Sequence, residues 1–239
     1  MRAQAAFRFV ERCKQENDIP ALIEEFQARI ADFGFTASVC GAWSGVGKGR
    51  MYRFYFNNWP ADWLAIYERG KFFADDPLVA HARSHMTLFL WTEVQAHIRL
   101  TPQAIKIRDL TAAYGWREII GVPIHGPAGY QGLVSLASLS DVHLSSTDRA
   151  LIHLLALTIH DRCHSSPDFG WQGSATPNLT ARELECVQWA AAGKTDWEIG
   201  QLMNITAATA HFHIEKVKKK LGIRSRVQAI VLMTLRGLI

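Results

Sequence analysis

The chain has 239 residues, of which 49% are apolar and 20% charged, enough to bury one large core or two smaller ones. Its longest apolar runs are far below the roughly 18–20 residues that cross a bilayer, and the N-terminus lacks the features of a signal peptide. The four cysteines are widely spaced, which favours neither a disulfide framework nor a zinc ribbon. We therefore expect a globular cytoplasmic protein with reduced thiols, and no membrane segment, cofactor or metal.

Positive charge is concentrated near the C-terminus. Residues 178–239 hold nine Lys and Arg against five acidic residues, whereas the rest of the chain is balanced. Six of the nine cations lie between Lys216 and Arg226. This density indicates an anionic polymer as partner, because each neutralised phosphate releases counterions. The alternative is a solvated helix face.

The first two thirds of the chain alternate between helical and strand patterns. Apolar residues at helical spacing predict a helix from Ile19 to Phe33, which Gly34 ends. Aromatic and β-branched runs predict five strands, at 35–43, 51–56, 88–91, 118–124 and 132–139. Further helices fit at 61–69, 77–84, 102–114 and 146–163, and the last is preceded by a cap-like Ser145-Ser-Thr-Asp148. The expected fold class is α+β, an antiparallel sheet with helices packed on it.

A segment rich in turn-forming residues separates this region from the C-terminal one. Residues 166–177 contain Ser, Pro, Gly and Asp without sustained periodicity, which is typical of a linker. We therefore predict two domains, at 1–165 and 178–239.

The C-terminal domain carries three helix-start signals in succession. Thr180 and Thr195 are each followed three residues later by Glu, a capping box, and Thr206 marks a third start. The connection before the third helix is only a few residues long, as in a helix-turn-helix. In that third helix the apolar residues share one face, made of Ala207, Ala210, Ile214, Val217 and Leu221. The polar and aromatic side chains on the other faces suit a helix that reads base edges near its N-terminus and meets phosphates further along.

Several spaced motifs in this domain resemble the DNA-binding domain of LuxR-type regulators. They are Leu179-Thr-Ala-Arg-Glu183, Gly193-Lys-Thr195, Glu198-Ile199, Thr209-x-x-Phe212-His213, Lys220-Leu-Gly-Ile223 and Arg226-x-x-Ala229. By this resemblance His211, Phe212 and Glu215 approach base edges, although Glu215 departs from a basic recognition surface. The full DNA-binding set implied is Thr209, His211, Phe212, His213, Glu215, Lys216, Lys218, Lys219 and Lys220.

Motifs in the first domain are similar to the autoinducer-binding domain of the acyl-homoserine lactone receptors in the same family. They are Trp59-Pro60-x-x-Trp63-x-x-x-Tyr67, Asp76-Pro77, Trp91, Gly115, Pro123-Ile-His-Gly126 and Gly132-x-x-Ser135-Leu136. A phosphorylatable receiver domain, the other common partner of such a helix-turn-helix, would need an arrangement of acids and a Lys that is missing. The resemblance covers nearly the whole chain and implies an α/β/α sandwich, an N-acyl-homoserine lactone as regulatory ligand, and a quorum-sensing transcription regulator.

The resemblance also assigns ligand contacts. Trp63 donates to the lactone carbonyl, Asp76 accepts from the amide N–H, Ser135 bonds the acyl-side carbonyl, and Tyr67 and Trp91 wall the pocket. Each polar atom of a desolvated ligand needs such a partner. The alternatives are that Asp76 caps the next helix, alone or while it binds, and that Ser135 is a small packing residue.

Two positions depart from the family pattern. Trp59 stands where relatives usually have a Tyr, although its indole N–H is also a donor, and Ile119 stands where they commonly have Gly. With Trp43 and Leu133 as further candidates to line the cavity, we expect a shorter, branched or aromatic acyl group. The same departures leave open an orphan regulator that binds DNA without a lactone.

Other chemistries find little support. His81 and His85 have a metal-binding spacing but lack a third ligand, and the glycine-rich segment 45–49 fails as a phosphate loop. No nucleophile with a base and an orienting group can be assembled, so an enzyme is not expected. Twofold DNA geometry predicts a homodimer on a palindromic site, with the helices at 146–163 and 226–235 as candidate contacts.

Overall fold

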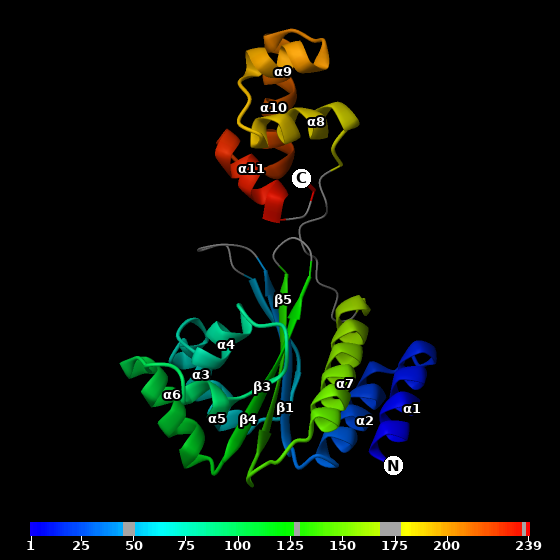
Figure 1. Ribbon diagram of the computed structural model, residues 1–239, viewed down its shortest axis with the longest axis vertical. Coiled ribbons are helices and arrows are strands. Elements are labelled where there is room, and N and C mark those ends of the chain that lie inside the picture. The colour runs from blue at the N-terminus through cyan, green and yellow to red at the C-terminus, as the bar shows by residue number, and fades with distance from the viewer. Residues whose placement is uncertain (45–50, 127–129, 168–177, 236–237) are drawn as a thin grey trace. The chain divides into compact units, whose positions relative to one another are not determined.

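The computed structural model describes residues 1–44, 51–126, 130–167, 178–235 and 238–239. The chain divides into two compact units, an N-terminal one built around a β-sheet and a C-terminal one built from helices (Figure 1). Over the described ranges, no helix has the length and apolar character needed to span a membrane.

A five-stranded antiparallel sheet forms the centre of the N-terminal unit, with strand order β2-β1-β5-β4-β3. The strands are β1 (Ala37–Ser44), β2 (Met51–Asn57), β3 (Phe89–Leu90), β4 (Glu118–His125) and β5 (Gln131–Ser138). In this register Ser135 of β5 lies opposite Val39 of β1 on one side and Gly121 of β4 on the other. Ser135 therefore occupies the middle of the sheet.

Helices cover both faces of the sheet (Figure 1). One layer consists of α1 (Arg2–Gln15), α2 (Ile19–Ala31) and α7 (Ser146–Ser165). The other consists of α3 (Ala61–Arg69), the 3-10 helix η2 (Phe72–Ala74), α4 (Pro77–Ala82), α5 (Trp91–Gln95) and α6 (Pro102–Ala113). The predicted α+β class, in the form of an α/β/α sandwich, is confirmed.

Local signals explain where most of these helices begin. The side chains of Asp18, Thr101 and Ser145 accept hydrogen bonds from backbone N–H groups in the first turns of α2, α6 and α7, which satisfies donors that have no partner within a helix. Proline stands at the start of α2, α4 and α6, where its missing N–H costs nothing.

The structure corrects the sequence prediction around Trp91. The predicted strand at 88–91 is reduced to Phe89–Leu90, and Trp91 opens helix α5. The Glu93 side chain accepts from the Leu90 N–H at 3.2 Å, and this cap starts a helix where the apolar run indicated strand. Helix α1 and the 3-10 helix η2 were not predicted, and the glycine-rich segment 45–49 lies outside the described residues.

The C-terminal unit comprises α8 (Ala181–Ala191), α9 (Asp196–Met203), α10 (Ala207–Leu221) and α11 (Arg226–Leu235). The capping boxes at Thr180 and Thr195 are present, and the Thr206 side chain caps α10. On the predicted apolar face of α10, the buried residues are Ala210, Ile214 and Val217, while Ala207 and Leu221 are half-buried.

The turn between α9 and α10 depends on two residues. Asn204 ends α9 in the left-handed region, at φ 54°, a conformation that asparagine tolerates better than most residues. A Cβ on Gly200 would lie 2.9 Å from the carbonyl oxygen of Ile205, so only glycine lets the turn pack this closely on α9. The predicted helix-turn-helix is confirmed.

Candidate ligand pocket and DNA-binding helix

A cavity of about 80 Å³ lies in the N-terminal unit between the sheet and the layer of α3 to α6. Its lining is largely apolar and aromatic. All six residues expected to contact a ligand line it, namely Trp59, Trp63, Tyr67, Asp76, Trp91 and Ser135. Residues between Trp59 and Ser135 thus meet at one site, because strands β1, β2, β4 and β5 and helices α3, α4, α5 and α6 converge there.

Indole rings form one wall of this cavity. Trp63 of α3 is 2% exposed and stacks on Tyr67 one turn later, with ring centroids 4.8 Å apart. Trp59 meets Trp63 edge-on at 4.2 Å and lies 4.8 Å from Trp116. Edge-to-face and offset-stacked arrangements are the favourable ones for aromatic pairs. The bulk of Trp59 is therefore accommodated within a packed aromatic cluster.

Three buried polar atoms at this cavity have no hydrogen-bond partner in the part of the chain that the structure describes. They are the indole Nε1 of Trp59, the indole Nε1 of Trp63 and the hydroxyl of Ser135. A buried polar group without a partner costs about 1–3 kcal/mol, so it points to a partner absent from the protein itself. All three atoms can donate a hydrogen bond.

Asp76 provides the acceptor at the same site. One carboxylate oxygen accepts from the Tyr67 hydroxyl at 2.6 Å, and the other accepts from the Leu78 N–H at 2.8 Å, which caps α4. Burial raises the pKa of this carboxyl, while the hydrogen bonds from Tyr67 and Leu78 act to lower it. A carboxylate offers about four acceptor sites, so capping leaves room for a further donor.

Another part of the lining is bulky and apolar. Trp43 of β1 meets Phe73 edge-on at 5.3 Å, and its Nε1 donates to the side-chain oxygen of Gln131 at 2.6 Å. Ile119 and Leu133, from β4 and β5, are both buried and line the same cavity. This geometry favours a compact apolar group.

Helix α10 presents the side chains that the sequence assigned to DNA. Those most open to solvent are His211, Phe212, Glu215, Lys216, Lys219 and Lys220, whereas Thr209, His213 and Lys218 are half-buried. Phe212 is 54% exposed, and the Lys216 ammonium lies over its ring, 4.6 Å from the centroid. An exposed aromatic ring beside a cation suits contact with a base edge and a neighbouring phosphate.

Two lysines of α10, Lys218 and Lys220, donate hydrogen bonds to other groups of the C-terminal unit. Lys218 Nζ donates to Glu215 at 2.6 Å. Lys220 Nζ donates to Glu183 at 2.6 Å and to the carbonyl oxygen of Asn178 at 2.8 Å. Although burial raises the pKa of Glu183, the hydrogen bonds from Lys220 and Thr180 hold it below its ordinary value overall.

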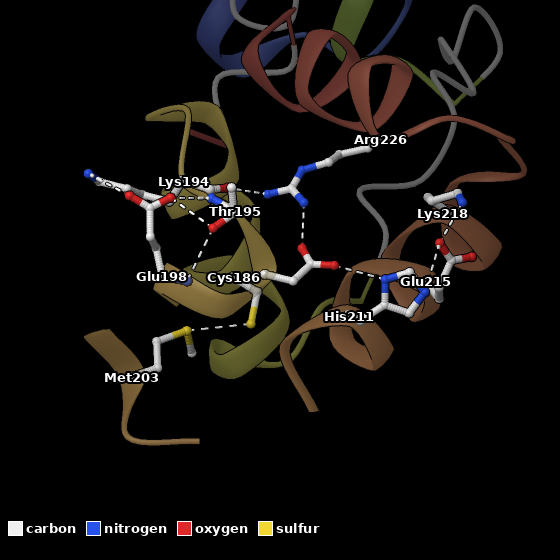
Figure 2. Close-up of polar contacts among 10 residues, drawn as sticks. Cys186, Lys194, Thr195, Glu198, Met203, His211, Glu215, Lys218 and Arg226 are labelled. Carbon is white, nitrogen blue, oxygen red and sulfur yellow. Dashed lines mark hydrogen bonds and ion pairs between the residues drawn. The ribbon is translucent and has the colours of Figure 1, made fainter. Parts of the chain in front are cut away.

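His211 is tied to a second helix (Figure 2). Its Nδ1 lies 2.9 Å from Oδ2 of Asp196, the first residue of α9. The other oxygen of Asp196 accepts from Arg226, at the start of α11, which also donates to the carbonyl oxygen of Lys194 at 2.5 Å. A single carboxylate thus links three helices of the unit.

Comparison with known proteins identifies the family. The family model described as "Autoinducer binding domain" matches residues 18–163, and the one described as "Bacterial regulatory proteins, luxR family" matches residues 177–233. The chain belongs to the luxR family. It is a DNA-binding transcription regulator with an autoinducer-binding domain.

Individual relatives resemble this luxR-family chain over nearly its whole length. RpaR of Rhodopseudomonas palustris, a quorum sensing-dependent transcriptional regulator, is 31% identical over 98% of this chain and 94% of its own. The transcriptional activator BjaR1 of Bradyrhizobium diazoefficiens is 29% identical over 95% and 93%. SdiA of Escherichia coli shares the fold, with a TM-score of 0.78 at 20% identity over 98% of this chain and 97% of that one.

Some residues of this luxR-family site were not predicted. Phe73 and Thr111 line the cavity, and Trp116 packs on both Trp59 and Trp63. Trp116 directly follows Gly115, whose φ of +79° makes the turn before β4. Its place next to this motif glycine was the sequence signal that could have identified Trp116 as a site residue. Thr111 lies on α6, whose sequence shows no marked apolar stripe.

The two histidines with metal-binding spacing, His81 and His85, contact each other. The rings of His81 and His85 stack 3.5 Å apart, and His85 Nδ1 lies 2.9 Å from the carbonyl oxygen of His81. Burial and the nearby His85 lower the pKa of His81. Over the described ranges, no set of three or more His, Cys, Asp and Glu side chains is arranged to hold a metal ion.

Proposed function

We propose that the N-terminal domain binds an N-acyl-homoserine lactone with a short, branched or aromatic acyl group. The observation that carries the proposal is the set of buried donors without partners, on Trp59, Trp63 and Ser135, around one cavity with the Asp76 carboxylate. An N-acyl-homoserine lactone presents a lactone carbonyl, an amide carbonyl and an amide N–H. Three donors and one acceptor are the complement of that ligand.

The resemblance to the acyl-homoserine lactone receptors implies the individual roles, and each suits the donor or acceptor character of its side chain. Trp63 Nε1 donates to the lactone carbonyl, Asp76 accepts from the amide N–H, and Trp59 Nε1 and the Ser135 hydroxyl serve the acyl-side carbonyl. Tyr67 and Trp91 enclose the ligand, and Tyr67 also orients Asp76 through its hydroxyl. Binding satisfies groups that otherwise cost free energy, and so stabilises the folded state.

The apolar side chains of the lining limit the length of the acyl group. Trp43, Phe73, Ile119 and Leu133 occupy volume that a long straight chain would need. An aromatic or branched group packs against such side chains with more contact per unit length.

On the DNA side, we propose that α10 lies in the major groove of a palindromic promoter site, in the cytoplasm, with two copies of the chain related by a twofold axis. His211, Phe212 and Glu215 face base edges, and Thr209, His213 and the lysines at 216, 218, 219 and 220 lie nearer the backbone. Domains at 1–165 and 178–239 with a linker at 166–177 separate the two tasks. The helices at 146–163 and 226–235 are the proposed dimer contacts.

The test is the thermal midpoint of the purified full chain with lactones that vary in acyl length, branching and aromaticity. At a concentration about 100 times the dissociation constant, the matching ligand adds about 2.7 kcal/mol, which corresponds to a rise of roughly 5–10 °C. A strongest response to long straight 3-oxo chains would overturn the acyl assignment. No response to any lactone, in a chain that binds DNA, would favour an orphan regulator.

A matched pair of variants tests the donor assignment. Trp63→Phe removes an unpaired indole N–H that lines the cavity, and Trp116→Phe removes a neighbouring indole from the same aromatic cluster. We expect Trp63→Phe to weaken lactone binding about tenfold, from the loss of one desolvated hydrogen bond, and Trp116→Phe to change it little. Equal effects of the two variants would contradict the role of Trp63.

A further inference from the structure

The carboxylate of Asp196 holds one side chain of α10 in a set orientation. Oδ2 of Asp196 lies 2.9 Å from Nδ1 of His211, and Oδ1 accepts from Arg226 (Figure 2). The Arg226 guanidinium is anchored in turn on the carbonyl oxygen of Lys194 at 2.5 Å. The Asp196 and Arg226 side chains are 25% and 32% exposed, so this pair is partly shielded from water and less screened than a surface ion pair.

This contact fixes which nitrogen of His211 carries the proton. An ionised carboxylate only accepts hydrogen bonds, so the Nδ1 beside it must be the N–H. In the neutral imidazole the other nitrogen, Nε2, is then an acceptor. Free imidazole side chains prefer the opposite tautomer, with the proton on Nε2, so the Asp196 contact changes the chemical character that the ring presents.

The His211 ring remains available to a partner outside the protein. Its side chain is 61% exposed and lies in the N-terminal half of α10. Glu215 Oε1 is 3.9 Å from Nε2, beyond hydrogen-bond range, and the same oxygen accepts from Lys218 at 2.6 Å.

We propose that Asp196, clamped by Arg226, is a positioning residue that makes His211 Nε2 an acceptor for an exocyclic amino group, on adenine or cytosine, in the major groove. These are the amino donors that bases present there. The proposal rests on α10 being the recognition helix, and it is independent of the lactone assignment. Asp196 itself lies on α9 and acts through His211.

The first test reads the tautomer directly, without DNA or lactone. Nitrogen-15 NMR of the full chain labelled at histidine, recorded at pH 8, distinguishes Nδ1–H from Nε2–H. The His211→Gln variant assigns the signal by its loss. We expect His211 to carry its proton on Nδ1, and Asp196→Ala to shift it towards Nε2–H. A wild-type proton on Nε2 would overturn the proposal.

The second test reads base preference. Binding sites for the full chain are first selected from random duplex DNA. The affinities for all single-base variants of the selected site are then compared. His211→Ala should reduce discrimination at one position, occupied by adenine or cytosine on the contacted strand, by about fivefold. Asp196→Ala should reduce it at that same position, and the double variant should lose no more than His211→Ala alone.

A matched control separates positioning from general weakening. Lys219→Ala removes a cation of the same helix and should lower affinity for all sequences alike. If Asp196→Ala behaves like Lys219→Ala, and discrimination at the His211 position survives, Asp196 does not position His211. Because the tautomer is measured without DNA, it decides the first step even where Asp196→Ala lowers stability.

Discussion

The two units of this chain differ in the pairing of the polar groups at their functional sites. Around the cavity of the N-terminal unit, the buried donors of Trp59, Trp63 and Ser135 are left without partners. In the C-terminal unit, the charged groups of Asp196 and Glu183 are tied to side chains of other helices. The first arrangement is incomplete until something binds, whereas these two carboxylates of the C-terminal unit have their partners within the protein.

This difference assigns the two units different sources of stability. An unpaired buried donor lowers stability and makes it depend on the ligand that satisfies it. A network of paired charges sets the shape of a surface and leaves its stability independent of that ligand. The N-terminal unit is thus suited to sensing, and the C-terminal unit to presenting a fixed surface to DNA.

The largest effect expected to distinguish the two units is a loss of stability of the N-terminal unit in acid. Burial, with a contribution from His164, lowers the pKa of His160 from 6.5 to about 4. Between these values the unfolded chain binds a proton that the folded one rejects, so stability falls as pH drops from 6.5 towards 4, by about 3 kcal/mol. Urea unfolding across this pH range measures it.

The matched variants are His160→Phe and His97→Gln. His160 packs edge-on against Tyr55 with ring centroids 5.5 Å apart, and phenylalanine keeps that contact without a titrating group. His160→Phe should flatten the acid limb of the stability curve, and His97→Gln, at an exposed position, should leave it intact. A variant curve parallel to the wild type would show that His160 does not carry the effect.

A second prediction concerns Lys220, which the sequence assigned to DNA. Its amino group pairs with Glu183, a side chain that is 3% exposed. Lys220→Met leaves this carboxylate without its cation, and we expect the C-terminal unit to lose about 2 kcal/mol. The additional change Glu183→Gln should recover part of the loss. Unchanged stability with weakened DNA binding would instead support a backbone contact.

The smallest effect separates the lysines of α10 by their contribution to DNA binding. Lys219→Ala should weaken binding to all sequences and lower the salt dependence by about one counterion. Lys218→Ala should do less, because Glu215 already neutralises Lys218. Titrations at several salt concentrations compare the two slopes. A larger change for Lys218→Ala would show that the Glu215 pair opens on DNA.

Features set by neighbouring residues were predictable from the sequence. The capping boxes at Thr180 and Thr195 fixed two helix starts, and the spacing of Ala210, Ile214 and Val217 identified the buried face of α10. The cavity residues were also found together, because an ordered series of motifs carried them.

Features that depend on distant residues were not predictable in this way. The pairing of Asp196 with His211 and Arg226 joins side chains 15 and 30 positions apart, and no local pattern specifies it. The start of α5 at Trp91 depends on a cap that overrides an apolar run. Trp116, between α6 and β4, joins the aromatic cluster through contacts with Trp59 and Trp63, which lie far earlier in the chain.

The most direct test of the central claim is calorimetric unfolding of the full chain with and without a stabilising lactone. Ile214 is buried in the core of the C-terminal unit, so Ile214→Ala should lower that unit's stability by about 2–5 kcal/mol. The transition that this variant moves to lower temperature belongs to the C-terminal unit. We predict that the lactone raises the N-terminal transition and leaves the C-terminal one in place. An equal shift of both transitions, or a shift of the C-terminal one alone, would contradict the account.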